Sequence, residues 1–128
     1  MISDLPLVLI VDDNDKNRKL ARDVLRMAGL RTLEAATAAE GIAIASEHLP
    51  NVILMDLRLP DLDGTGAARL LRSEPRTAGI PVVAMTALPL DDRDDWLFDA
   101  GFAGYIAKPI DIDALPDMVR GFCRPGLE

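Results

Sequence analysis

The chain has 128 residues, a length that suits one domain able to bury a core without disulfides or a structural metal. Its 14 basic and 21 acidic residues give a net charge of −7, the wrong sign for a protein that binds nucleic acid through phosphates. The single cysteine, Cys123, excludes an internal disulfide, and neither a signal peptide nor a run of ~20 apolar residues is present, so we expect a reduced cytoplasmic protein with no membrane partner.

Five short apolar runs alternate with stretches of helical pattern along the chain. Their apolar residues follow one another and do not alternate with polar ones, which is typical of strands buried on both faces of a parallel sheet. We therefore expect an α/β fold of the (βα)5 type. The expected strands are Leu7 to Val11, Arg31 to Ala35, Val52 to Met55, Val82 to Thr86 and Tyr105 to Ala107.

The first two expected helices have clear end signals. The first ends at Gly29, because glycine suits the left-handed position that follows a helix. The second begins at the capping-box spacing of Thr37 and Glu40 and ends before Leu49 and Pro50. The apolar stripe expected to face the core from the first helix is Leu20, Ala21, Val24, Leu25 and Ala28.

Three further helices are expected in the second half of the chain. One runs from Thr65 to Arg72, and the next from about Asp91 to Ala100, where its acidic start complements the helix dipole. The last begins near Asp113, which places Pro116 in the first turn, where its missing N–H costs little. The side chains expected to face the core are Ala67, Leu70 and Leu71, then Leu90, Leu97 and Ala100, then Leu115, Val119 and Phe122.

Charged residues follow three of the expected strands. Right-handed crossovers and a strand order of 2-1-3-4-5 place the switch point of the sheet between the first and third strands. Asp12 and Asp13 follow the first strand, Asp56 follows the third and Lys108 follows the fifth. Because the carboxyl ends of parallel strands meet at one edge, these four side chains should converge there.

Three carboxylates at one edge need positive charge nearby. At ~4 Å and an effective dielectric constant near 20, each close pair repels by about 4 kcal/mol. Mg²⁺ takes oxygen ligands, uses one or two carboxylates, and leaves room for a phosphoryl oxygen. Each signal alone is weak, since an acidic pair such as Asp12 and Asp13 is ordinary in an acidic chain and a strand-end aspartate often caps a helix. Their common edge makes the combination specific.

The same residues belong to motifs of specific order and spacing. The chain resembles a receiver domain of the two-component response regulators, of the single-domain type, over nearly its whole length. The resemblance implies a flavodoxin-like fold and one domain in residues 1–128, with its core in about residues 5–123. The motifs that carry it are Val11 to Asn14, Asp56 to Gly64, Met85 to Ala87 and Gly104 to Pro109.

The resemblance implies a role for each charged residue. Asp56 would accept a phosphoryl group from the phosphohistidine of a sensor histidine kinase or a histidine phosphotransfer protein. Asp12, Asp13 and Asp56 would hold Mg²⁺ or Mn²⁺, with the backbone carbonyl of Arg58 as a further ligand. Lys108 would pair with the phosphoryl group.

The resemblance also implies a cis peptide and a conformational switch. Lys108–Pro109 would be the cis bond, which only proline makes accessible at low cost. The Thr86 hydroxyl would move toward the phosphoryl group and vacate space into which Tyr105 turns. The signal would pass to a downstream protein target through the face formed by the fourth helix, fifth strand and fifth helix. The fourth helix and fifth strand also offer a route to a homodimer.

Three alternatives stay open. Asn14 and Asn17 resemble residues of receivers in relays and hybrid kinases, so the chain could pass its phosphate on to a downstream histidine. An aspartyl-phosphate phosphatase of the haloacid dehalogenase type is a weak alternative, because Arg58 stands where that family has a second acid. A receiver that binds partners regardless of phosphate is the third, and the complete site argues against it.

Two residues near the expected fourth helix are unusual. Pro89 lies three positions after Thr86 and should stiffen the loop that moves on activation. The inward stripe of the helix turns Trp96 away from Leu97, which favours either a partner surface or partial burial beneath a neighbouring element.

Overall fold

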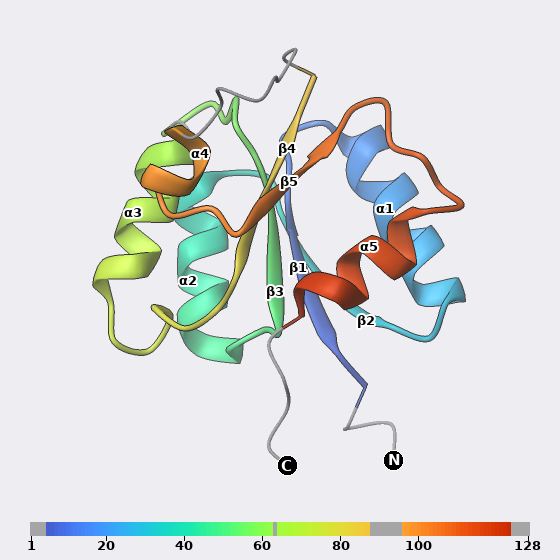
Figure 1. Cartoon of the computed structure of the whole chain (residues 1–128), viewed down its shortest axis with the longest axis horizontal. Helices are drawn as coiled ribbons and strands as arrows, with labels where there is room; N and C mark the ends of the chain where they lie inside the picture. The colour runs from blue at the N-terminus through green and yellow to red at the C-terminus, as the bar shows by residue number, and fades with distance from the viewer. Residues whose placement is uncertain (1–4, 63, 88–95, 124–128) are drawn as a thin grey trace.

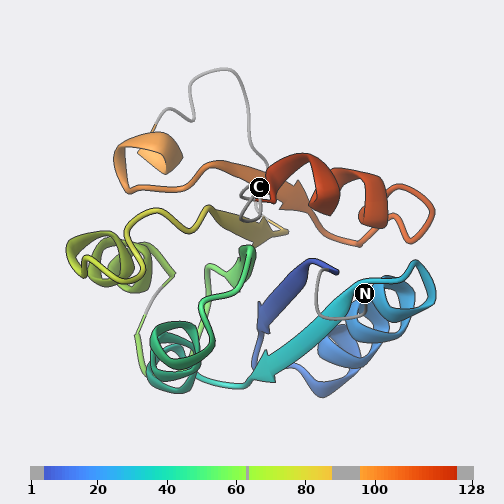
Figure 2. The same cartoon turned by 90° about the horizontal axis from the view of Figure 1, so that it is seen from below.

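The computed structural model describes residues 5–62, 64–87 and 96–123, which form a parallel sheet between two layers of helices (Figures 1 and 2). The strands lie in the order β2-β1-β3-β4-β5, and every neighbouring pair is parallel. The predicted fold class and strand order are confirmed. The strands are β1 (Leu7–Val11), β2 (Arg31–Ala35), β3 (Val52–Asp56), β4 (Val82–Thr86) and β5 (Gly104–Ala107).

Helices cover both faces of the sheet. In Figure 1, α1 and α5 lie on one face, and α2, α3 and α4 lie on the other. None of the helices in the described ranges is both long enough and apolar enough to cross a bilayer. The helices are α1 (Asp15–Met27), α2 (Ala38–His48), α3 (Gly64–Ser73), α4 (Trp96–Asp99) and α5 (Leu115–Phe122).

Parts of the expected fourth helix lie outside the described residues. Its expected start at Asp91 is among these, and Pro89 and Leu90, which precede it, lie outside the described residues as well. The expectations for these three residues stay predictions. The side chain of Trp96 is likewise outside the described set. Leu97 and Ala100 are buried, as expected for the inward stripe.

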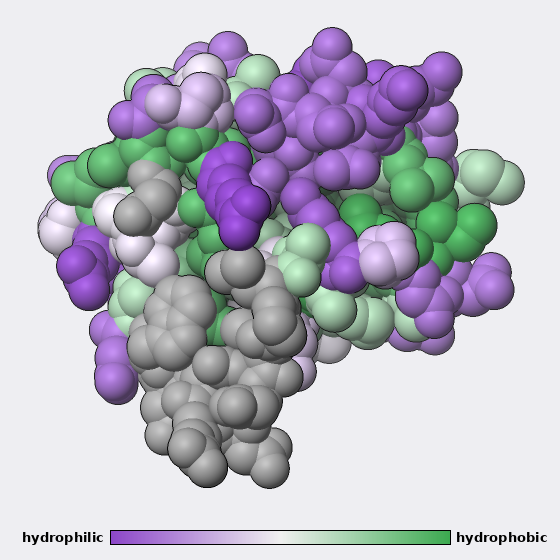
Figure 3. All heavy atoms as spheres, turned by 90° about the horizontal axis from the view of Figure 1, so that it is seen from above, coloured by the Kyte–Doolittle hydropathy of each residue, from purple (hydrophilic) through white to green (hydrophobic). Residues whose placement is uncertain are grey.

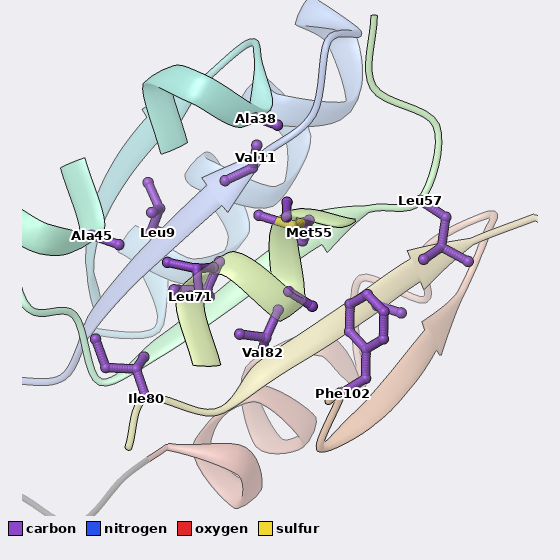
Figure 4. Packing of buried hydrophobic residues seen from close by; sticks show 14 of the residues in the cluster. Leu9, Val11, Ala38, Ala45, Met55, Leu57, Leu71, Ile80, Val82 and Phe102 are labelled. Carbon is purple, nitrogen blue, oxygen red and sulfur yellow. The ribbon is translucent and has the colours of Figure 1, made fainter. Parts of the chain in front are cut away.

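The core lies on both sides of the sheet because successive strand residues point to opposite faces. Leu9 and Val11 of β1 join the cluster beneath α2 and α3, shown in Figure 4, whereas Val8 and Ile10 join the cluster beneath α1 and α5. The residues of β3 and β4 are buried throughout. This explains the continuous apolar runs of the three central strands, whereas the expectation of burial on both faces is wrong for β2 and β5, which lie at the sheet edges and are only partly buried.

Two of the predicted inward residues are wrong. Leu20 is 41% exposed and Leu70 is 50% exposed, so neither belongs to the core. Each lies one residue, or about 100° of helix rotation, before a fully inward position, namely Ala21 and Leu71. The buried stripes are narrower than a hydropathy pattern suggests. Phe122 is only half-buried, at the edge of its cluster.

The predicted helix ends are confirmed at α1 and α2. Gly29 has φ +89°, the left-handed conformation that favours glycine after a helix. The Thr37 hydroxyl accepts a hydrogen bond from the Glu40 N–H at 3.1 Å. The Glu40 carboxylate in turn accepts from the N–H of Ala36 at 3.0 Å, one residue before the donor of a standard capping box.

A second, distant acceptor also meets the first turn of α2. The Asp61 carboxylate accepts hydrogen bonds from the N–H groups of Ala38 and Ala39, at 2.9 Å each. The N–H of Ala39 and then that of Ala38 lower the pKa of Asp61 below its ordinary value. Negative charge is favoured at this end of a helix because free N–H groups and the helix dipole point toward it.

We expect the Asp61 carboxyl to titrate below the ordinary aspartate pKa of about 3.9, as measured by NMR of the side-chain carboxyl. Because the folded pKa is the lower one, ionised Asp61 stabilises the fold above the unfolded pKa. That contribution is lost as the pH falls through the folded pKa.

The Asp61→Asn variant should therefore lose less stability than wild type across this acidic window. Denaturant unfolding at a series of pH values measures the difference. Glu47→Gln, which removes an exposed carboxylate elsewhere on α2, supplies the background effect of one lost surface charge. An Asp61 resonance that titrates at or above the ordinary value would contradict the expectation.

Candidate functional site

The predicted convergence of charged side chains at the carboxyl edge of the sheet is confirmed. Possible ligand atoms of Asp12, Asp13 and Asp56 all lie within 4.8 Å of one another. The Lys108 Nζ lies 3.1 Å from Asp12 Oδ2 and 3.2 Å from Asp56 Oδ2. Three strand ends, those of β1, β3 and β5, therefore supply one cluster.

Asp12 is buried and held on several sides. Its Oδ1 accepts a hydrogen bond from the Asn14 N–H at 2.9 Å, and its Oδ2 accepts from Lys108. The Arg18 guanidinium donates to the Asp12 backbone carbonyl at 2.7 Å and is paired with Glu34 at 3.5 Å. Asp13, by contrast, is exposed to solvent. The acidic pair thus offers one fixed and one accessible carboxylate.

Asp56 presents a desolvated carboxylate whose two oxygens have different partners. Oδ1 accepts from the Arg58 N–H at 3.0 Å, and Oδ2 accepts from the Lys108 ammonium. Burial raises the pKa of Asp56 above its ordinary value, although the Arg58 N–H and the charge of Lys108 act to lower it. The charge on this carboxylate is therefore weakly compensated, and additional positive charge at the site would stabilise it.

Lys108 balances the carboxylates from the other side. Burial acts to lower the pKa of Lys108, but the charge of Asp12, the hydrogen bond to it and the charge of Asp56 outweigh burial and raise the pKa. The ammonium is therefore held in its charged form, bridging two acids that would otherwise repel. The following Lys108–Pro109 peptide bond is cis, as the resemblance implies.

The segment that follows Asp56 packs closely against the end of β3. The Gly64 N–H donates to the Leu57 carbonyl at 3.0 Å, which closes the base of the loop. A Cβ on Gly64 would lie 2.7 Å from the Asp56 carbonyl oxygen and 2.9 Å from the Leu57 Cα. Only glycine permits this approach of the first residue of α3 to the backbone at the end of β3.

A cavity of about 550 Å³ opens over the cluster. Hydrophilic residues gather in a broad area of this face of the molecule, which Figure 3 views from the carboxyl ends of the strands. Thr86 is buried at the end of β4, and its backbone carbonyl accepts from the Lys108 N–H at 2.8 Å. The lining residues are Asp12, Asp13, Asn14, Asn17, Asp56, Leu57, Arg58, Thr86, Ala87 and Lys108.

The donor set fits a hard divalent cation. Three carboxylates supply only oxygen ligands, one of them is exposed, and the cavity leaves room for water or a phosphoryl group. Within the described ranges, no other set of three or more acidic, histidine or cysteine side chains is grouped in this way. Asp12, Asp13 and Asp56 could thus hold Mg²⁺ or Mn²⁺, with the backbone of Arg58 beside them.

Two contacts at the site were missed by reasoning from the sequence. Arg18 donates to a backbone carbonyl, and a backbone acceptor leaves no mark in the sequence. Asp61 reaches a helix 22 and 23 residues earlier in the chain. The sequence holds one indication of the Asp61 contact, because Ala38 and Ala39 at the start of α2 have no side-chain acceptor for their own free N–H groups. Tyr105, which the resemblance implies turns into the space that Thr86 vacates, is 45% exposed in this structure, and its role as a switch stays a prediction.

Comparisons with known proteins agree with this geometry. Residues 8–120 match the family described as the response regulator receiver domain. The polar-differentiation response regulator DivK of Brucella ovis is 32% identical over 115 residues, which cover 90% of this chain and 94% of that protein.

Solved structures show the same likeness. A CheY-like response regulator receiver domain protein from Methanospirillum hungatei has a TM-score of 0.82 at 27% identity, covering 91% of this chain and 92% of its own. The receiver domain of a sensor histidine kinase from Pseudomonas aeruginosa has a TM-score of 0.83 at 30% identity, covering 92% of this chain and 97% of its own. The latter structure has a magnesium ion coordinated in its active-site cleft.

Proposed function

This chain belongs to the response regulator receiver family, and from that premise we propose that it is a phosphorylation-controlled signalling domain whose phosphoacceptor is Asp56. The observation that carries the proposal is the cluster at one edge of the sheet, in which the Asp56 carboxylate lies within 4.8 Å of ligand atoms of Asp12 and Asp13 and accepts a hydrogen bond from Lys108. The donor is the phosphohistidine of a sensor histidine kinase or of a histidine phosphotransfer protein. The protein acts in the cytoplasm.

The chemistry follows from the arrangement around Asp56. One carboxylate oxygen attacks phosphorus in line with the bond to the histidine nitrogen, that P–N bond breaks, and the nitrogen keeps the electron pair. The product is an acyl phosphate on Asp56. The Arg58 N–H holds the other carboxylate oxygen, and the Lys108 ammonium takes up negative charge on the transferred oxygens.

Phosphoryl transfer of this kind also uses a divalent cation. Bound by Asp12, Asp13, Asp56 and the Arg58 carbonyl, Mg²⁺ or Mn²⁺ would supply positive charge that offsets repulsion between the acids and an incoming phosphoryl group. The similarity to a receiver solved with magnesium in its cleft supports this choice of ion.

The signal passes from the site to the face formed by α4, β5 and α5. Thr86 lines the cavity and is buried, so its hydroxyl is well placed to respond to a phosphoryl group on Asp56. Tyr105, on the neighbouring strand β5, is partly exposed and can turn inward when Thr86 moves. The face has an inactive and an active conformation, and phosphorylation shifts their populations only as far as it stabilises one over the other. A downstream protein or a second copy of the chain binds the favoured conformation.

A relay function is the second candidate. It is favoured by Asn17, which lines the cavity, and by the similarity to the receiver of a sensor histidine kinase. In a relay, the phosphoryl group passes from Asp56 to a histidine of another protein. Transfer of label from phosphorylated chain to a histidine phosphotransfer domain distinguishes a relay from a terminal receiver.

Intact mass measured after incubation with acetyl phosphate and Mg²⁺ tests the acceptor. Wild type should gain one phosphoryl group, and so should Asp23→Asn, which changes an exposed aspartate on α1. The Asp56→Asn variant should gain none, because an amide is not a competent nucleophile. An adduct on Asp56→Asn would contradict the assignment. So would the lack of any adduct on wild type together with no spectral response to beryllofluoride.

A further inference from the structure

The loop that follows the acceptor, residues 57–62, is in direct contact with the acceptor carboxylate. The Arg58 N–H donates to Asp56 Oδ1 at 3.0 Å, so the backbone of the loop sets the orientation of that carboxylate. Arg58 also carries the carbonyl expected to bind the metal ion. Whatever fixes the loop therefore fixes two elements of the site at once.

The base of the loop is held by the first residue of α3 and by β4. Leu57 is buried, its carbonyl accepts from the Gly64 N–H at 3.0 Å, and its N–H donates to the Met85 carbonyl at 3.3 Å. These contacts position one end of Arg58. They leave the far side of the loop, beyond Arg58, to be held by something else.

That far side is held by Asp61, which bonds to a different helix. Its two carboxylate oxygens accept from Ala38 and Ala39, 23 and 22 residues away in sequence, at 2.9 Å each. Because each oxygen takes a separate N–H, the contact fixes the direction of the carboxylate as well as its distance. The charged carboxylate and the helix N-terminus also attract each other.

The first turn of α2 needs this distant acceptor. At α1, the Asn14 side chain accepts from both Lys16 and Asn17 and thus caps its own helix. At α2, Thr37 caps only Glu40, which leaves the N–H groups of Ala38 and Ala39 to Asp61. The helix and the loop are therefore complementary in their hydrogen bonding.

The helix that receives Asp61 is firmly seated on the sheet. Ala38 and Ala45 are fully buried in the cluster that also contains Val11 and Met55 (Figure 4). A Cβ on Gly41 would lie 2.7 Å from Val11 Cγ2, which shows how closely α2 approaches β1. Since interiors packed this closely resist displacement, α2 provides a rigid point of attachment for the loop.

We propose that Asp61 is a positioning residue of the phosphoacceptor site: by holding residues 57–62 on the N-terminus of α2, it fixes the Arg58 backbone, which orients Asp56 and completes the metal site. The proposal rests on the proposed function for the role of the metal and of Asp56. It assigns to Asp61 no contact with metal, phosphoryl group or partner.

A capping role alone would predict a different outcome, and the chain offers a matched control. Thr37→Ala removes a hydrogen bond from the same helix N-terminus but leaves the attachment of the loop intact. Asp61→Ala removes the attachment, and Asp61→Asn keeps the side-chain volume with one acceptor oxygen and no charge. If Asp61 only stabilised α2, the Asp61 variants and Thr37→Ala would behave alike at the site.

Mg²⁺ titration of the full chain, followed through the backbone amide resonances of Asp56 and Arg58, is the first readout. We expect the apparent Kd for Mg²⁺ to rise about tenfold in Asp61→Ala, the low end of the effect of supporting contacts around metal ligands. Asp61→Asn should lie between Asp61→Ala and wild type, and Thr37→Ala should match wild type. The rate of phosphorylation by acetyl phosphate should follow the same order.

Equal Mg²⁺ affinity and equal phosphorylation rates in the Asp61 variants and Thr37→Ala would overturn the proposal. If Asp61→Ala does not fold, the comparison of Asp61→Asn with Thr37→Ala decides by the same criterion. A wild-type chain that binds Mg²⁺ but takes no phosphoryl group and shows no response to beryllofluoride would refute the proposed function, whereas the Mg²⁺ affinities of the variants would still decide the positioning role.

Discussion

Replacing Lys108 by methionine should lower the free energy of unfolding of the metal-free protein by about 2–3 kcal/mol, between the effects known for exposed and for buried ion pairs. For a chain of this size, that corresponds to a fall in Tm of about 10 °C. Methionine keeps an unbranched side chain that is one heavy atom shorter, so the loss reports mainly the charge. The Lys108 Nζ contacts Asp12 and Asp56 at 3.1 and 3.2 Å, so the substitution removes a positive charge in direct contact with two of the three clustered carboxylates.

The same geometry predicts two changes that restore stability to Lys108→Met. Adding Asp56→Asn to Lys108→Met should recover part of the lost stability, because it removes one of the repelling charges. Mg²⁺ should raise the Tm of Lys108→Met more than that of wild type, since a cation that binds the folded state supplies the missing charge.

Thermal unfolding in chelator and in Mg²⁺ measures both effects of the Lys108 substitution. Lys19→Met, which changes an exposed lysine on α1, is the control for loss of a positive charge from an acidic protein. Equal Tm values for Lys108→Met and Lys19→Met in chelator would show that Lys108 does not offset the repulsion.

Gly64→Ala should destabilise the protein by about 2–3 kcal/mol, the upper part of the range for overpacking. The added methyl group would lie 2.7 Å from the Asp56 carbonyl oxygen and 2.9 Å from the Leu57 Cα. Both are backbone atoms, so relief requires either α3 or the end of β3 to shift. Because Asp56 is the last residue of β3 and Gly64 of α3 packs directly against its backbone, either shift should also slow phosphorylation by acetyl phosphate.

A second glycine supplies the matched control for this substitution. A Cβ on Gly121, in α5, meets no atom within 4 Å, so Gly121→Ala should stabilise by up to about 1 kcal/mol through helix propensity. Denaturant unfolding measures both changes. Gly64→Ala with the stability and phosphorylation rate of wild type would show that the backbone accommodates the methyl group without cost.

The strands and the charged edge were predictable because their signals are local. A strand buried on both faces must be apolar throughout, and the run Val52 to Met55 shows that pattern without interruption. A charged residue directly after such a run has to lie at the carboxyl edge of the sheet. For this reason the order of residues alone places Asp12, Asp56 and Lys108 together, and their contacts confirm the placement.

The helix faces were predicted less well. Hydropathy marked Leu20 and Leu70 as inward, yet both are exposed, whereas Ala68, which was not among the expected inward residues, is buried beside the correctly predicted Ala67. Which part of an apolar stripe is covered depends on the angle and distance at which a helix packs on the sheet. Those quantities follow from the side chains of both partners and not from one helix alone.

By itself, the sequence determined the order of the elements, the edge at which the site forms and the residues that supply its charges. Periodicity and strand-end position are properties of neighbouring residues, so they are readable without coordinates. Only the tertiary structure decided how the site is held, through Arg18 on the Asp12 carbonyl and Asp61 on the N-terminus of α2. These contacts join side chains to backbone groups that every residue has, and packing alone determines which of those groups come within reach.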